Sequence, residues 1–167
     1  SGPDGDRESF EQYVAARRGA LLRTAYLLTG HREDAEDLVQ VALVKAVPHW
    51  PRIADDPEPY VRKILAHESV SRWRRRRWRE VHTDRVPETA VDGPSGDRVA
   101  LQQALATLAP RQRAVIVLRY YDDLTERETA TTLGIAVGTV KSQARDGLAR
   151  LRVLVPDLAR ELDEVRG

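Results

Sequence analysis

The chain has 167 residues, a net charge of +1 and no cysteine. The lack of cysteine excludes a disulfide framework, a thiol nucleophile and a cysteine-based zinc site. Hydrophobic residues make up 41% of the chain, enough for a core, and no apolar run reaches the ~18 residues of a membrane span. These properties predict a soluble cytoplasmic protein without a signal peptide, built as one mid-sized domain or two small ones.

Charge is segregated along the chain, although the total is close to zero. Residues 57–79 carry 8 basic and 2 acidic groups, and residues 98–152 carry 9 and 5. Between them, residues 80–97 carry 1 basic and 5 acidic groups. Two basic segments separated by an acidic strip predict a polyanionic partner that is contacted at two places.

The predicted elements are all helices, because no strand-like alternation persists in the sequence. Apolar residues at helical spacing predict a first helix that ends near Gly30, and a second that stops before Pro48. Four prolines in residues 48–59 predict a loop. A third helix is expected from Tyr60 to Glu80.

Residues 81–97 are rich in glycine and proline and lack an apolar stripe, which predicts a flexible acidic linker. Asp97 is a suitable cap for the next helix, and Pro110 is expected to open another. The sequence therefore predicts an all-α protein of two small helical domains, residues 6–80 and 98–155, joined by that linker.

Residues 125–151 have the spacing of a helix-turn-helix. Thr125 and Glu128 form a capping-box pattern, and Ala130 is followed four residues later by Gly134, where a tight turn needs positive φ. Val140 falls where the second helix must bury an apolar side chain. The polar face of that second helix, which is expected to enter the major groove, consists of Thr139, Lys141, Ser142, Arg145 and Asp146. The alternative is an ordinary helical hairpin with a solvated polar face.

Residues 71–79 contain six arginines and two tryptophans. One face of this helix combines cations, hydrogen-bonding groups and an aromatic ring, which suits phosphates and unpaired bases; it consists of Lys63, His67, Ser71, Arg74 and Trp78. The loop before it offers Trp50, Arg52 and Ile53, which could trap a base that has left its stack. The alternatives are a solvated helix end and, for Trp50, a place in the core.

Several motifs resemble those of bacterial sigma factors. Residues 25–30 (AYLLTG) and 34–40 (DAEDLVQ) are similar to the first conserved region, and residues 71–77 (SRWRRRR) to the end of the −10-binding domain. Residues 108–113 (LAPRQR) and 138–142 (GTVKS) are similar to the −35-binding domain. Two such domains alone resemble the extracytoplasmic-function (ECF, group IV) class of the sigma-70 family, and within it the SigE-like subgroup.

This resemblance implies a role for each domain. Residues 6–80 would bind core RNA polymerase through its clamp helices, using Asp37, Leu38, Gln40, Val41 and Lys45. The same domain would melt and hold single-stranded −10 DNA, using Trp50, Arg52, Tyr60, Lys63, His67, Ser71, Arg74, Arg75 and Trp78. Residues 98–155 would contact the polymerase flap and read the −35 duplex, using Arg111, Arg113, Thr139, Lys141, Ser142 and Arg145.

No catalytic or metal-binding pattern is recognisable. The four histidines share no helical spacing, and the acids at Glu33, Asp34, Glu36 and Asp37 suit a helix start better than a metal site. We therefore expect no enzyme activity, metal or cofactor. The resemblance also implies a possible anti-sigma partner. The alternative functions are a stand-alone helix-turn-helix regulator and, less favoured, an arginine-rich RNA-binding protein.

Overall fold

A computed structural model describes residues 2–82, 96–157, 159, 160 and 162. The described parts contain helices and turns and no strand, as predicted. In chain order the helices are α1 (Pro3–Thr29), α2 (Arg32–Ala46), the 3-10 turn η1 (Val47–His49), α3 (Trp50–Ile53), α4 (Glu58–His82), α5 (Gly96–Ala106), α6 (Pro110–Ile116), the π-helical turn η2 (Val117–Tyr121), α7 (Glu126–Leu133) and α8 (Val137–Leu154).

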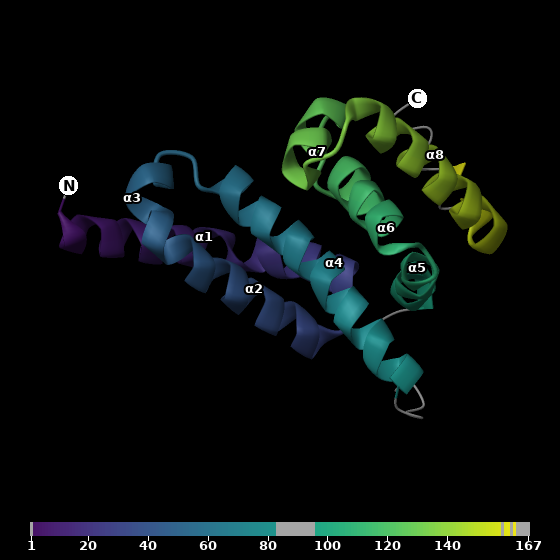
Figure 1. Cartoon of the computed structure of the whole chain (residues 1–167), viewed down its shortest axis with the longest axis horizontal. Helices are drawn as coiled ribbons and strands as arrows, with labels where there is room; N and C mark the ends of the chain where they lie inside the picture. The colour runs from purple at the N-terminus through teal and green to yellow at the C-terminus, as the bar shows by residue number, and fades with distance from the viewer. Residues whose placement is uncertain (1, 83–95, 158, 161, 163–167) are drawn as a thin grey trace.

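The N-terminal domain is a bundle of α1, α2 and α4 (Figure 1). Leu21, Leu38, Val61 and Leu65 are among the side chains that form its buried core. Gly30 ends α1 in the left-handed conformation at φ 81°, and its backbone N–H donates to Tyr26 O. The predicted end of the first helix is therefore confirmed at a position where glycine avoids steric strain.

Most of the proline-rich segment is helical, so the predicted loop over residues 48–59 is wrong except at the turn of residues 54–57. Pro48 and Pro51 lie in the first turns of η1 and α3, and Pro59 lies in the first turn of α4. A proline in a first turn removes no helical hydrogen bond, because the N–H groups there have no intrahelical partner. These three prolines therefore mark where helices begin.

The C-terminal domain consists of α5 to α8. Leu105, Ile116, Leu148 and Leu151 belong to one of its buried clusters. Pro110 opens α6 as predicted. Helix α5 begins at Gly96 and α4 continues to His82, so both helices extend into the predicted linker. The rest of that linker, residues 83–95, lies outside the described residues.

Helices α6 and α8 approach closely at Gly147, which is buried. A Cβ atom at this position would lie 3.0 Å from Ile116 Cγ1. We expect Gly147→Val to overpack this contact and to lower the free energy of unfolding by about 1–3 kcal/mol. Urea denaturation followed by circular dichroism measures this change. Ala149→Val, at an exposed position of α8, is the matched control, and an equal loss there would contradict the close-packing argument.

The two domains pack against each other, which the sequence did not predict. Helix α4 contacts α6 and α7, and α1 contacts α5 and η2 (Figure 1). Leu28 and Ala66 of the N-terminal domain belong to the same buried cluster as Ala114, Val117 and Leu118 of the C-terminal domain. An apolar core therefore continues from one domain into the other.

Candidate nucleic-acid interface

Helices α7 and α8 form the predicted helix-turn-helix. Glu128 N–H donates to Thr125 Oγ1 at 3.0 Å, and Thr125 N–H donates to Glu128 Oε1 at 2.9 Å. These two bonds are the capping box, and they lower the pKa of the exposed Glu128 carboxyl. Gly134 ends α7 at φ 67°, and Val140 is fully buried. All these predicted features of the motif are confirmed.

The first half of α8 carries two exposed cations, Lys141 and Arg145. Thr139 and Ser142 lie beside them and are half-buried, and Ser142 Oγ donates to Thr139 O at 3.0 Å. Arg145 Nε lies 3.4 Å from Asp146 Oδ1. The face thus combines long cations with short hydroxyl groups, the side chains that bind phosphates and base edges in a major groove.

The two arginines predicted near the start of α6 have different environments. Arg111 is exposed, whereas Arg113 is 7% exposed. Arg113 Nε donates to Leu27 O at 2.7 Å, and Nη2 donates to Gln102 Oε1 at 3.4 Å. Burial lowers the pKa of Arg113 to about 10, so its guanidinium stays charged at neutral pH. The prediction that Arg113 binds DNA is therefore wrong for this conformation, because its guanidinium hydrogen-bonds across the domain interface.

The basic helix α4 presents the predicted stripe to solvent. Lys63, His67, Arg74 and Trp78 are exposed, and Ser71 is half-buried. Arg75 is exposed next to this stripe, and its Nη1 lies 3.5 Å from Ser71 Oγ. A cationic stripe with an aromatic ring at one end can follow a phosphate backbone and stack against a base.

Trp50 is part of the core and is a correction to the predicted base-trapping loop. Its side chain is 3% exposed, its ring makes an edge contact with Phe10 at a centroid distance of 5.1 Å, and Nε1 donates to Ser9 Oγ at 2.7 Å. A ring held in this way is not available to bind a base.

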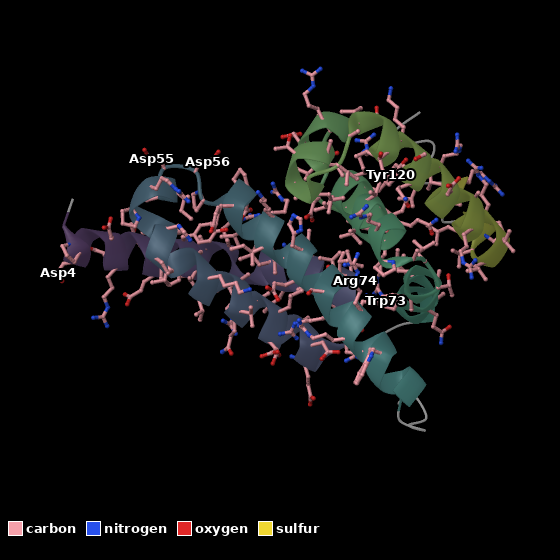
Figure 2. The ribbon with its side chains drawn as sticks, viewed as in Figure 1. Asp4, Asp55, Asp56, Trp73, Arg74 and Tyr120 are labelled. Atoms are coloured by element: carbon pink, nitrogen blue, oxygen red, sulfur yellow. The ribbon has the colours of Figure 1, made fainter. Side chains whose placement is uncertain are left out.

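The neighbours of Trp50 remain accessible. Arg52 is exposed, with Nη2 3.2 Å from His49 Nδ1. Tyr60 is half-buried, with its ring 5.3 Å from that of His49. Asp55 and Asp56 project from the turn between α3 and α4 (Figure 2), and their charges weaken phosphate binding nearby. This turn is therefore a less cationic surface than the stripe on α4.

The predicted polymerase-binding residues of α2 divide into two groups. Asp37, Gln40 and Lys45 are exposed and Val41 is half-buried. Leu38 is fully buried in the core, so its prediction as a contact residue is wrong: the helix turns its side chain inward, away from any partner.

Ion pairs hold α2 against α4. Asp37 Oδ2 lies 2.5 Å from Arg72 Nη2, and Lys45 pairs with Glu68. Next to these pairs, Val44 is 69% exposed and Val47 is 50% exposed. The sequence analysis missed these two valines, although an apolar residue outside the buried stripe of a helix is a detectable signal. The face therefore combines charge with exposed apolar surface.

Polar contacts reinforce the domain interface at Asp122. Thr24 Oγ1 donates to Asp122 Oδ1 at 2.7 Å, and Arg62 Nε lies 3.8 Å from Asp122 Oδ2. Burial raises the pKa of Asp122, and the Thr24 hydrogen bond and the Arg62 charge act against this increase. The sequence gave no signal for these contacts, because the partners lie on different helices far apart in the chain.

No three histidine, cysteine or acidic side chains lie together as a metal site among the residues that the structure describes. Within the same residues, no helix is both long and apolar enough to cross a membrane.

Comparison with known proteins identifies the family. Residues 13–79 match the family "Sigma-70 region 2", and residues 98–151 match "Sigma-70, region 4". An RNA polymerase sigma-E factor of Streptomyces avermitilis is 41% identical over 153 residues, which are 89% of this chain and 86% of that protein. A sigma-E factor of Streptomyces coelicolor is 40% identical over 164 residues, 95% of this chain and 92% of that protein.

Solved structures agree with this relationship. The sigma factor RpoE of Bartonella quintana, crystallised with the anti-sigma factor NepR, has a TM-score of 0.73 and 27% sequence identity. The alignment covers 88% of this chain and 96% of that one. The fold and the matched regions together define a two-domain transcription initiation factor. The chain belongs to the ECF class of the sigma-70 family of RNA polymerase sigma factors.

Proposed function

We propose that this chain directs core RNA polymerase to a specific set of promoters and starts transcription there. Residues 6–80 bind the polymerase and the −10 element, and residues 98–155 bind the −35 element. The observation that carries this proposal is the capped helix-turn-helix, whose exposed Lys141 and Arg145 stand over the fully buried Val140. The membership of the sigma-70 family supports the same function.

Each DNA element is assigned to an exposed polar surface. The −35 duplex binds the outer face of α8 and the start of α6, through Arg111, Thr139, Lys141, Ser142 and Arg145. The −10 element binds the stripe of α4 and the turn before it, through Arg52, Tyr60, Lys63, His67, Ser71, Arg74, Arg75 and Trp78. Each base that is taken out of the paired stack costs a few kcal/mol. Stacking and phosphate contacts must offset this cost, so melting is driven by stronger binding to unstacked DNA than to paired DNA.

Core polymerase is assigned to the outer face of α2. The polar and partly apolar contacts come from Asp37, Gln40, Val41 and Lys45. The exposed Val44 and Val47 extend this surface with a hydrophobic patch at its end. RNA synthesis itself belongs to the polymerase, so the chain acts by binding and not by catalysis. The chain acts in the cytoplasm, where the polymerase and the chromosome are.

An anti-sigma factor is the second class of protein partner that we propose. The B. quintana relative was crystallised with the anti-sigma factor NepR. A second fold neighbour, CnrH, was solved with the cytosolic domain of CnrY. A protein of this class would act on the present chain by covering the surfaces assigned to polymerase and DNA.

The decisive experiment is in vitro transcription with purified core polymerase and a promoter library. We expect this chain to co-elute with core enzyme and to support run-off transcripts from a defined subset of promoters. A stand-alone regulator would bind duplex operator DNA without polymerase and would yield no transcripts. An RNA-binding protein would bind RNA hairpins as tightly as promoter DNA.

Replacing Lys141 and Arg145 together with alanine will weaken −35 selection at least about tenfold, because a good contact to a base edge contributes about 1–3 kcal/mol. The measurement is transcription from promoters that differ only in the −35 element. Binding to core polymerase will be unchanged, since both side chains belong to α8 and not to the surface of α2 assigned to polymerase. The control is Arg18→Ala with Arg160→Ala, which removes two exposed cations elsewhere. Unaltered −35 preference would contradict the assignment of α8 as the reading helix.

A further inference from the structure

A cavity of about 370 Å³ lies where the two domains meet. Its wall combines the end of α1, the beginning of α2 and the second half of α4 with one side chain of α6. Trp73 and Arg74 mark this part of α4 in Figure 2. The charged residues of the wall are Arg72, Arg75, Arg76, Arg113, Asp34 and Asp37, so the wall carries two more positive than negative charges.

Two of the four arginines are neutralised by the aspartates. Arg72 pairs with Asp37 at 2.5 Å, and Arg76 pairs with Asp34. Within the part of the chain that the structure describes, no carboxylate pairs with Arg75 or Arg113, and Arg75 reaches only Ser71 Oγ, at 3.5 Å. The uncompensated charges therefore come one from each domain, from α4 and from α6.

Hydrogen-bond donors around the cavity also lack acceptors. Arg72 Nε and Gln102 Nε2 are buried and have no partner. Gln102 Oε1 accepts from Arg113 Nη2, so this orphan amide lies beside the buried guanidinium. Burial of Arg113 without a negative charge lowers its pKa, a sign that the charged form is under-stabilised. Buried donors are normally paired, and these two unpaired ones, one of them beside the uncompensated Arg113, indicate a missing oxyanion.

We propose that this cavity binds a small phosphate group that bridges Arg75 of the N-terminal domain and Arg113 of the C-terminal domain. Guanidinium groups suit this ligand because their forked donors match phosphate oxygens. The volume accepts free phosphate or the terminal phosphates of a nucleotide, which share the same chemistry. Because the two arginines meet only when the domains are docked, the ligand stabilises the closed arrangement.

Phosphate binding to the isolated chain does not depend on the proposed function, whereas its consequence for promoter binding rests on that function. A phosphate at Arg75 would occupy a side chain that we assign to the −10 element. It would also hold the two DNA-binding domains together. Ligand binding would therefore compete with promoter binding, and a phosphate-bearing metabolite would reduce the activity of the factor.

The test uses the full chain without polymerase, with inorganic phosphate and ATP as probes and sodium chloride at matched ionic strength as the reference. Affinity is measured by isothermal titration calorimetry. Domain separation is measured by fluorescence energy transfer between labels at Ala15→Cys and Ala149→Cys, since the chain has no other cysteine. We expect saturable binding of at least one probe and a shift toward the closed arrangement. Tighter binding of ATP than of phosphate identifies a nucleotide as the source, and the reverse order identifies the free ion.

Arg113→Gln and Arg75→Gln will each lower the affinity at least tenfold. Arg127→Gln removes the same charge from an exposed position of α7 and will leave it unchanged. If Arg113→Gln does not fold by circular dichroism, Arg75→Gln decides alone, because Arg75 is exposed and outside the core. The proposal is overturned if neither probe binds above the chloride reference, or if Arg127→Gln loses as much affinity as Arg75→Gln.

Discussion

Replacing Trp50 with alanine will lower the free energy of unfolding of the N-terminal domain by about 3–5 kcal/mol, the usual cost of removing a buried large aromatic side chain. The ring is 3% exposed and packs against Phe10 and Tyr13. Its Nε1 also donates to Ser9 Oγ, so the substitution leaves both a cavity and an unpaired hydroxyl. Urea denaturation followed by circular dichroism measures this loss of stability on the protein without DNA.

Trp78→Ala is the matched control, because that side chain is 62% exposed. We expect its effect on stability to be well below that of Trp50→Ala. If both variants lose less than about 1 kcal/mol, Trp50 is not a core residue, and the original hypothesis of a base-trapping loop returns. The pair thus distinguishes a structural role for Trp50 from a direct role in melting.

Replacing Ala66 with glutamate will separate the two domains. Ala66 is fully buried in the cluster that the domains share. A buried charge without a partner costs about 3–5 kcal/mol, and opening the interface returns the carboxylate to water. Small-angle X-ray scattering will show a larger radius of gyration, while circular dichroism will show that helix content is retained.

Ala114→Glu places the same charge on the other side of this interface, where Ala114 is also fully buried. It should open the molecule as Ala66→Glu does. Ala16→Glu, at an exposed position of α1, controls for added charge and should leave the radius of gyration unchanged. Equal compactness of all three variants would show that the shared cluster does not hold the domains together.

The features that the sequence predicted correctly depend on local chemistry. The capping box at Thr125 and the helix ends at Gly30 and Gly134 each involve residues a few positions apart, and each has one favourable backbone solution. The exposed stripe of α4 and the cationic face of α8 follow from helical periodicity. Such patterns are readable without knowledge of the tertiary structure.

The errors arose where tertiary packing decides the environment of a side chain. Leu38 and Trp50 have polar neighbours in the sequence, but in the folded bundle both side chains face the core. Arg113 is buried because its guanidinium reaches Leu27 O, 86 positions away in the chain. Four prolines in residues 48–59 were read as helix breakers, although Pro48, Pro51 and Pro59 each occupy a first helical turn. No local signal distinguishes these outcomes.

Helix α4 couples DNA binding to the docking of the C-terminal domain, because both use its surface. One side of α4 bears the stripe assigned to promoter DNA. Another side pairs through Arg72 with α2, the helix that we assign to polymerase, and a third holds the C-terminal domain at Ala66. If undocking of that domain changes the affinity of α4 for DNA by some factor, DNA must change the undocking equilibrium by the same factor. Promoter capture and domain release are thus two measurements of a single coupling free energy.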